Sequence, residues 1–243
     1  MIKEWFKTDL GVLYQGHILD VLENFPNESI DCIITSPPYW RLSDFGKDTE
    51  VKWPSGWYGQ LGWEPILDLY IEHLLYIMKE LKRVLKKMGV IFWIHGDYYK
   101  DGLYLINYRF ASYCIDKFGL ILKNIIVVYK QKGITMENNL SNNHEPIFIF
   151  AKDKNHWFNP NEITSNVWTI PFATSLENYF QFFKEKIIKP MIEIGCPESG
   201  IILDPFMGGG SVAIVAEELN RKWIGIEIKE QYCKLIEQLL RKN

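Results

Sequence analysis

The sequence predicts one α/β domain built around a doubly wound, mostly parallel sheet. Its 243 residues suit a single large domain, and 47% apolar with 23% charged residues is typical of a globular chain. Compact apolar runs alternate with segments of helical periodicity, as parallel strands alternate with crossover helices. Two unusual turns, at residues 36–40 and 204–211, directly follow such runs. Ligands of α/β sheets bind beyond the carboxyl ends of strands, so these turns are the first candidates for a functional site.

The expected strands are short apolar runs that end in polar or turn-forming residues, because strands inside a parallel sheet are covered on both faces. Two of them, 120–129 and 145–151, flank a polar loop and are expected to pair as one antiparallel edge hairpin. Along the chain, the expected strands are Val12–Gln15, Asp31–Thr35, Val90–Ile94, Leu120–Tyr129, Glu145–Ala151, Ile201–Leu203 and Trp223–Ile226.

The expected helices lie between these runs and carry apolar residues three or four positions apart. The longest begins at Pro65, since proline is favoured in a first turn, and ends before Gly89. Residues 41–63 are instead rich in Gly and Trp and predict a long loop, which in a compact domain is usually functional or disordered. The expected helices are Ile18–Phe25, Pro65–Lys87, Leu105–Lys117, Tyr179–Ile194, Ser211–Leu219 and one at the C-terminus.

Charge and cysteine content exclude several classes of protein. The 27 Lys and Arg residues are balanced by 30 Asp and Glu residues, for a net charge of −3, so the chain does not coat nucleic acid with a basic surface. The four cysteines lack CxxC spacing and the five histidines lack HExxH spacing, so we expect neither a metal site nor a disulfide framework. No apolar stretch of about 18 residues and no secretory signal is found, so we expect a cytoplasmic protein without a membrane span.

The glycine-rich turn Asp204-Pro-Phe-Met-Gly208-Gly-Gly210-Ser joins an expected strand to an expected helix. Glycines let a ligand approach the backbone closely. The next strand ends in Glu227, about 20 residues later, where a carboxylate can accept both ribose hydroxyls of an adenosine-containing cofactor. Gly208-x-Gly210-x-x-Ala213 also matches the dinucleotide fingerprint, so a nicotinamide cofactor is an alternative. Asp204 would repel a pyrophosphate but could pair with an ammonium group, such as that of S-adenosylmethionine.

The turn Ser36-Pro37-Pro38-Tyr39-Trp40 is the more specific signal. Two prolines stiffen the backbone and expose the carbonyl of Pro37. The exocyclic amine of a nucleobase could donate to Ser36 and to this carbonyl while Tyr39 stacks on the base. Such an amine is a poor nucleophile, because its lone pair is delocalised into the ring. Accepting its hydrogens favours a lone-pair-bearing nitrogen, and the turn could then orient this nitrogen against a sulfonium methyl group.

Together, Thr35–Trp40 and Asp204–Gly210 resemble the amino-group DNA methyltransferases of the circularly permuted β class, in which the catalytic motif precedes the cofactor motif. The resemblance extends over nearly the whole chain. It implies one catalytic domain over residues 1–243 with the Rossmann-like methyltransferase fold, S-adenosyl-L-methionine as cofactor and double-stranded DNA as substrate. In this family Ser-Pro-Pro-Tyr usually accompanies methylation of cytosine N4, and the forms with Asp or Asn accompany adenine N6. Cytosine N4 is therefore predicted, with adenine N6 as the alternative.

Carried over by position, the resemblance also implies roles for individual residues. In two places this chain differs from the family pattern. His17 stands where Asp often follows glycine after the first strand, and Asn178–Phe183 replaces a usual His-x-x-x-Phe-Pro segment. The implied catalytic residues are Ser36, Pro37, Pro38 and Tyr39, and the implied cofactor-binding residues are Asp204, Phe206, Gly208, Gly210, Ser211 and Glu227.

Residues 41–63 and 130–166 mix Lys, Asn and aromatic side chains and are the candidate DNA-contact loops. The basic helix tail Lys79–Lys87 is interpreted instead as a solvated face, because its charges avoid the apolar stripe. The resemblance suggests a cognate restriction endonuclease as a partner. A homodimer is among the oligomeric states that the sequence leaves open.

Three other functions are weighed against this prediction. A nicotinamide-dependent oxidoreductase would leave the turn at residues 36–40 without a role. A non-catalytic DNA-binding module is disfavoured by the net charge of −3 and by the glycine turn. Methylation at carbon 5 of cytosine would need a nucleophilic cysteine, typically in Pro-Cys, whereas Cys196 precedes Pro197.

Overall fold

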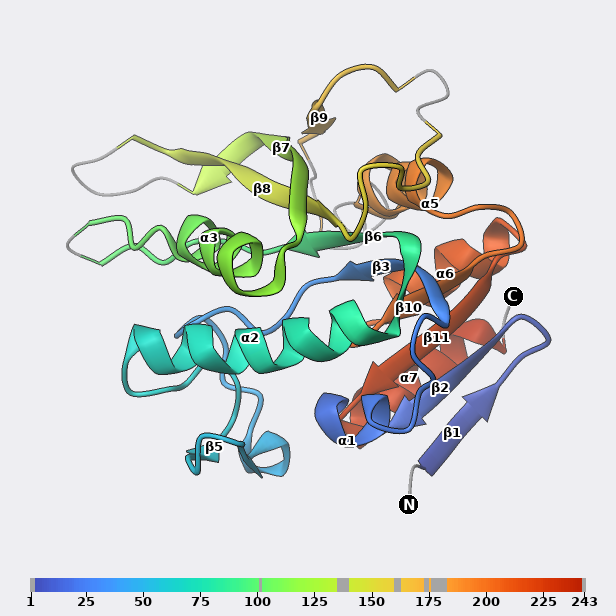
Figure 1. Cartoon of the computed structure of the whole chain (residues 1–243), viewed down its shortest axis with the longest axis horizontal. Coiled ribbons are helices and arrows are strands. Elements are labelled where there is room, and N and C mark those ends of the chain that lie inside the picture. The colour runs from blue at the N-terminus through green and yellow to red at the C-terminus, as the bar shows by residue number, and fades with distance from the viewer. Residues whose placement is uncertain are drawn as a thin grey trace.

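The computed structural model describes residues 3–100, 102–134, 140–159, 163–172, 175 and 183–241. Within this part of the chain, nine strands form one sheet in the order β1-β2-β11-β10-β3-β6-β8-β7-β9, with helices on both faces (Figure 1). The strands are β1 (Lys3–Lys7), β2 (Gly11–Gln15), β3 (Ile30–Thr35), β6 (Leu85–Ile94), β7 (Ile121–Ile134), β8 (Asn142–Ala151), β9 (Val167–Ile170), β10 (Ile201–Asp204) and β11 (Lys222–Glu227).

The helices form two layers, because adjacent residues of each strand point to opposite faces of the sheet. Ile33 and Trp93 pack in one hydrophobic cluster with the first three helices, whereas Ile34 and Phe92 pack in a second cluster with the last three. These helices are α1 (Ile18–Leu22), α2 (Leu67–Val84), α3 (Ile106–Phe118), α5 (Lys189–Gly195), α6 (Ser211–Glu218) and α7 (Glu230–Leu240).

The centre of the sheet is parallel, with β2, β11, β10, β3 and β6 running in one direction. This arrangement confirms the predicted doubly wound, mostly parallel fold. The expected hairpin is present as the antiparallel pair β7 and β8, and β9 lies outside it, parallel to β7. A second hairpin at the opposite edge joins β2 to β1. Strand β1 was not expected, because three of its five residues are charged.

Three expected helices differ in extent, the first of which, α1, ends at Leu22 rather than at Phe25. α2 ends at Val84 rather than at Lys87, because Leu85 takes an extended backbone and pairs with Ile30 at the start of β6. In the segment expected as a helix over 179–194, residues 179–182 lie outside the described part of the chain. The rest is a π-helical turn (Lys184–Ile188) that continues into α5, whose first turn contains a proline. Proline has no N–H to continue a regular helical ladder.

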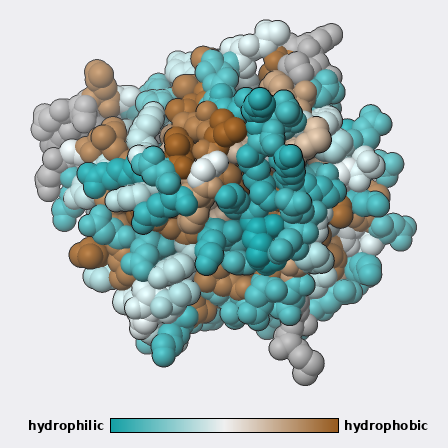
Figure 2. All heavy atoms as spheres, viewed as in Figure 1, coloured by the Kyte–Doolittle hydropathy of each residue, from teal (hydrophilic) through white to brown (hydrophobic). Residues whose placement is uncertain are grey.

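The molecular surface is mostly hydrophilic in the orientation of Figure 1, with hydrophobic residues in smaller patches (Figure 2). At the basic end of α2, Arg83 connects this helix to the end of α1. Its guanidinium donates to the carbonyls of Leu22 and Phe25 and pairs with Glu80. None of the helices in the described ranges is long and apolar enough to cross a membrane. Among the same residues, no group of three or more metal-ligating side chains could hold an ion. All four cysteines are buried and unpaired.

Candidate active site

The two unusual turns lie side by side at the carboxyl edge of the sheet. β3 and β10 are parallel neighbours, with Leu203 paired to Ile33, so the chain leaves both strands at the same edge. Thr35 Oγ1 donates a buried hydrogen bond of 3.2 Å to Asp204 Oδ1. The end of β11 is adjacent, because Asp204 is also in register with Gly225. Strand order therefore brings together residues that are far apart in the sequence.

A cavity of about 280 Å³ opens where these three strands end. It is lined by both turns, by the residues after β2, which include His17, and by part of the loop 41–63. The predicted site residues that line it are Ser36, Pro37, Pro38, Tyr39, Phe206, Gly208 and Glu227. All four predicted catalytic residues and three of the six predicted cofactor residues thus share one cavity.

Glu227 is the carboxylate of this cavity. Its Oε2 accepts a hydrogen bond from the backbone N–H of Gly208 at 2.8 Å, and its Oε1 accepts one from the N–H of Lys229 at 2.8 Å. Gly208 has a φ of +50°, in the left-handed region where glycine has no steric cost. Burial raises the pKa of the Glu227 carboxyl, and the two backbone donors oppose this shift. The last residue of β11 and the glycine turn are therefore held together at the cavity wall.

The other three predicted cofactor residues are not among those that line the cavity. Asp204 is buried and accepts a 3.1 Å hydrogen bond from the N–H of Phe206, and burial raises its pKa to about 7. Gly210, with a φ of +81°, lies so close to Ile236 of α7 that a Cβ there would be 2.9 Å from its side chain. Ser211 begins α6. In the structure, these residues shape the turn that presents Phe206 and Gly208.

Tyr39 is held from two sides. Its phenol donates to Glu145 Oε1 on β8 at 2.5 Å, and its ring lies against that of His95 with the centroids 4.5 Å apart. Ser36, whose side chain is exposed, donates from Oγ to the Tyr39 phenol oxygen at 3.3 Å. Burial raises the pKa of Tyr39 well above its usual value, and Glu145 raises it further. The phenol therefore keeps its proton at neutral pH.

The backbone of this turn is also fixed. The Tyr70 hydroxyl donates to the carbonyl of Pro38 at 2.7 Å, and its oxygen lies 2.6 Å from His95 Nε2. Burial lowers the pKa of His95 to about 4, so the imidazole is neutral at pH 7. The single hydroxyl proton of Tyr70 points to the Pro38 carbonyl, so the hydrogen between Tyr70 and His95 must be on His95 Nε2, which donates to the Tyr70 oxygen. The Pro38 carbonyl is thus engaged within the protein, whereas Ser36 and Pro37 line the cavity.

The sequence did not assign roles to Tyr70, His95 or Glu145. Tyr70 belongs to the apolar stripe of α2 and is indistinguishable there from a core residue. His95 follows the apolar end of β6, and Glu145 lies near the start of β8. Since β6 and β8 are antiparallel neighbours, these two ends meet at one edge of the sheet. In the sequence, the only indication of a role for His95 and Glu145 is that each is a polar residue at the end of an apolar strand.

The loop 41–63, predicted to contact DNA, supplies one wall of the cavity through residues such as Phe45 and Trp53. Lys229 Nζ donates to the carbonyl of Phe45 and connects the loop to the start of α7. The second candidate DNA-contact loop, 130–166, includes residues 135–139 and 160–162, which lie outside the described part of the chain. The segment Asn178–Phe183 lies outside it as well, apart from Phe183.

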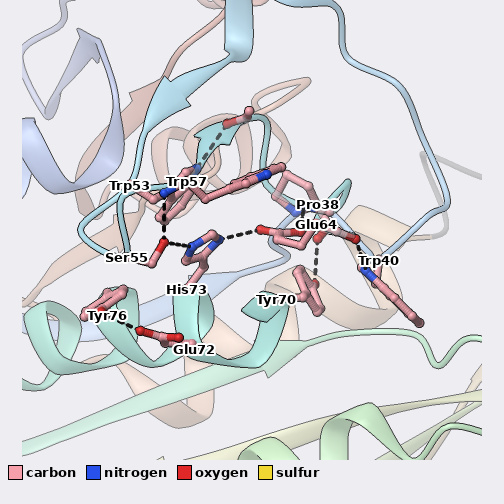
Figure 3. A network of polar contacts seen from close by, with 12 residues as sticks. Pro38, Trp40, Trp53, Ser55, Trp57, Glu64, Tyr70, Glu72, His73 and Tyr76 are labelled. Carbon is pink, nitrogen blue, oxygen red and sulfur yellow. Dashed lines mark hydrogen bonds and ion pairs between the residues drawn. The ribbon is translucent and has the colours of Figure 1, made fainter. Parts of the chain in front are cut away.

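A buried polar network ties the loop 41–63 to α2 (Figure 3). His73, on α2, donates from Nδ1 to Glu64 Oε1 at 2.7 Å, and its Nε2 lies 2.8 Å from Ser55 Oγ. Glu64 Oε2 accepts from the N–H of Gly62 at 2.9 Å. The His73 ring stacks on Trp53, with the centroids 4.4 Å apart. Trp53 is thus held in place by a network that is not itself part of the cavity.

Comparison with known proteins shows which family this chain belongs to. A family model for DNA methylases of the N6 and N4 type matches residues 30–238. The chain belongs to the DNA methylase family. The matched segment begins with β3 and ends within α7, so it contains both turns and Glu227. The resemblance drawn from the two sequence motifs is confirmed.

Individual DNA methylases are similar over most of their length. The Type II methyltransferase M.XycI of Xanthomonas campestris pv. cyanopsidis is 26% identical over 93% of this chain and 86% of its own. The DNA adenine methyltransferase YhdJ of Escherichia coli (strain K12) is also 26% identical, over 95% of this chain and 82% of its own.

Solved structures share the fold. The PvuII DNA methyltransferase (cytosine-N4-specific) matches with a TM-score of 0.76 and 21% identity, over 96% of this chain and 87% of that structure. The complex of M1.HpyAVI with SAM matches with a TM-score of 0.66 and 20% identity, over 95% of this chain and 98% of that structure. The predicted methyltransferase fold is therefore confirmed over almost the whole chain.

Proposed function

We propose that this DNA methylase transfers a methyl group from S-adenosyl-L-methionine to the exocyclic N4 of a cytosine flipped out of double-stranded DNA. One observation carries the proposal: the Ser36-Pro-Pro-Tyr39 turn and the Phe206–Gly208 turn line the same cavity. A nucleophile held by the first turn and a methyl donor held by the second would meet there without a large movement of the fold. Holding two reactants in one geometry is a major source of rate enhancement.

The residues at the glycine-turn end of the cavity fit the cofactor. The Glu227 carboxylate accepts backbone N–H groups at both oxygens, and it lines the cavity, where its remaining acceptor capacity would meet the hydroxyls of a ribose. Phe206 and Trp53 provide apolar and aromatic wall for an adenine ring. His17 lines the same end, and burial lowers its pKa, so a neutral imidazole replaces the carboxylate that the family often has there. The cofactor, when bound, supplies an electrophilic methyl group on a sulfonium.

The base end of the cavity fits an exocyclic amine. Ser36 Oγ and the Pro37 carbonyl would accept its two hydrogens, and Tyr39 would stack on the ring. Accepting both hydrogens favours a nitrogen with a localised lone pair, which is the form that attacks a methyl group. Burying the base against these groups also excludes water, which strengthens each hydrogen bond. Asp204 lies buried beneath the glycine-rich turn, where an ammonium group of the cofactor would favour its ionised form. Gly210 and Ser211 would maintain the shape of this turn.

The serine at the first position of the catalytic turn supports cytosine N4. The second candidate is adenine N6, which is supported by the similarity to the Escherichia coli adenine methyltransferase. Purified protein is incubated with plasmid DNA and labelled cofactor, and the digested nucleosides are separated by mass spectrometry. N4-methylcytosine is the expected product, and N6-methyladenine would select the second candidate. If neither appears across DNA of varied sequence, the proposal fails.

We also propose that the chain acts on cytoplasmic DNA within a restriction–modification system. The support is the similarity to M.XycI, which is named as a Type II methyltransferase. A cognate endonuclease would then cut the same sequence that this chain methylates. Co-expression tests the idea: plasmid DNA from cells that produce the chain is challenged with endonucleases of matching specificity. Protection supports the assignment, and unimpaired cutting at the methylated site contradicts it.

A further inference from the structure

Glu145 has no role in the motifs or in the proposed function, yet it is in direct contact with Tyr39 of the turn Ser36–Trp40, which is called the base turn below. Its Oε1 accepts the hydroxyl of Tyr39 at 2.5 Å, and its Oε2 accepts Lys130 Nζ at 2.8 Å. The side chain is only 14% exposed. Both carboxylate oxygens therefore have a donor, and the shorter of the two hydrogen bonds is the one to Tyr39.

These contacts define the direction of a hydrogen-bond chain. A carboxylate accepts hydrogen bonds and has no hydrogen to donate, so the single O–H of Tyr39 points to Glu145. The phenol oxygen can then only accept from Ser36, 3.3 Å away. The Ser36 O–H therefore points to Tyr39, and its lone pairs are left for the cavity, which Ser36 lines.

We infer that Glu145 is a positioning residue that makes Ser36 an acceptor, so that the base site selects an amino group over a carbonyl at the same ring position. The inference rests on the proposed function, in which Ser36 meets the exocyclic group of the base. An amine there donates to Ser36. The carbonyl of uracil only accepts, so it would face the Ser36 lone pairs without a hydrogen between them. Such a mismatch in a site built for a hydrogen bond lowers affinity by about tenfold or more.

Glu145→Gln is the informative substitution. It reverses the direction of the hydrogen bonds that link Glu145, Tyr39 and Ser36, and it leaves the shape of the side chain at position 145 unchanged. Lys130 can only donate, so it retains the amide oxygen and leaves the amide NH₂ directed at Tyr39. The amide then donates to the phenol oxygen, and the Tyr39 hydroxyl is free to donate to Ser36. The Ser36 hydrogen would turn toward the base. Lys130→Met is the matched control, because it removes the neighbouring charge but leaves a carboxylate that accepts from Tyr39.

The experiment measures binding of the full chain to a duplex that carries its methylation site, with either cytosine or uracil at the target position. The readout is the ratio of the two dissociation constants. A mismatched uracil flips out more easily, but this contribution cancels when variants are compared. We expect the preference for cytosine to fall about tenfold in Glu145→Gln and to persist in Lys130→Met. Tyr39→Phe removes the hydroxyl that links Glu145 to Ser36 but keeps the aromatic ring, so it should also lower the preference for cytosine over uracil.

Cofactor affinity, measured by calorimetry, should be unchanged in Glu145→Gln and Lys130→Met and shows that both are folded, and circular dichroism shows that Tyr39→Phe is folded. An unchanged preference in Glu145→Gln would overturn the inference, and so would an equal loss in Lys130→Met, which would indicate a general effect of the ion pair. The proposed function is tested separately. If the unmodified chain methylates no DNA, that proposal fails, whereas methylation with an unchanged base preference removes only the role of Glu145.

Discussion

Thr35 Oγ1 donates a hydrogen bond to Asp204 Oδ1 across 3.2 Å, in the interior of the protein. The two residues are 169 positions apart in the sequence and end the two strands that carry the functional turns. This contact directly connects the turn that follows Thr35 to the turn that begins at Asp204, through neighbouring parallel strands. The relative position of the two turns therefore depends on strand pairing and one buried hydrogen bond, not on the long connection between them.

Ser36→Ala should lower methyl transfer by about 100-fold with little change in stability. The hydroxyl is exposed in the free protein, so its removal leaves no cavity in the core, whereas it would accept a hydrogen of the reacting amine in the transition state. Single-turnover methylation measures the rate, and urea denaturation measures stability. A rate within about threefold of the unmodified chain would contradict the assigned role.

Glu227→Gln should weaken cofactor binding by about tenfold or more, as measured by calorimetry. An amide cannot accept from both Gly208 and Lys229, because one of its groups is a donor, so the turn loses a hydrogen bond as well as a charge. Glu230→Gln is the control, since Glu230 is 54% exposed and pairs with Lys234 on the surface of α7. If both substitutions have equal effects, Glu227 does not hold the cofactor.

Asp204 should make the cofactor-free protein less stable as the pH rises. Burial raises its pKa from 3.8 to about 7, so between these values the unfolded chain has lost a proton that the folded chain retains. The stabilisation is present at low pH and is lost as the pH rises toward 7, by up to about 4 kcal/mol. Urea denaturation at pH 5 and pH 8 measures the change. The Asp204→Asn variant should lack this component, and an identical pH dependence in both proteins would show that Asp204 is not responsible.

His73→Ala should destabilise the fold by about 3 kcal/mol, because it leaves Oε1 of the fully buried Glu64 side chain without its hydrogen-bond donor. It should also speed cofactor release, since the same network holds Trp53 at the cavity wall. Stopped-flow displacement and chemical denaturation give the two quantities. Ser55→Ala removes only the exposed end of the network and should lower the free energy of unfolding by about 1 kcal/mol. Equal effects of the two substitutions would argue against a special contribution of the buried His73–Glu64 hydrogen bond.

Gly96→Ala should weaken base binding while cofactor affinity stays constant. A Cβ at Gly96 would lie 2.7 Å from the ring of Tyr39, so the ring must move away from its place between His95 and the cavity. Fluorescence of a duplex with 2-aminopurine at the target position reports the flipped base, and calorimetry reports the cofactor. Normal base flipping in this variant would show that Tyr39 tolerates displacement.

The two unusual turns could be recognised in the sequence because their residue types are chemically unusual for a strand end. Pro37 and Pro38 cannot continue a strand, and the glycines of the second turn follow an isolated carboxylate. Local chemistry alone was sufficient there. The alternation of strands and helices likewise predicted the parallel centre of the sheet, because buried strands have short apolar runs.

Features that depend on tertiary contacts were not predictable in this way. Leu85 and the lysines that follow it continue a helical pattern, but pairing with Ile30 draws them into β6. Tyr70 is part of a core stripe by its spacing, and only the fold brings its hydroxyl to the carbonyl of Pro38. Glu145 reaches Tyr39 from a strand 106 residues away. The residues that hold the Ser36–Trp40 turn thus come from three separate elements, and only the fold brings their side chains to it.

The most direct test of the central claim is sequencing that reports modified bases on a plasmid methylated by the purified chain. The account predicts N4-methylcytosine at one defined sequence context, in a reaction that requires S-adenosyl-L-methionine and is lost in Ser36→Ala. A plasmid without modified bases at any sequence, from a folded protein that binds the cofactor, would contradict it.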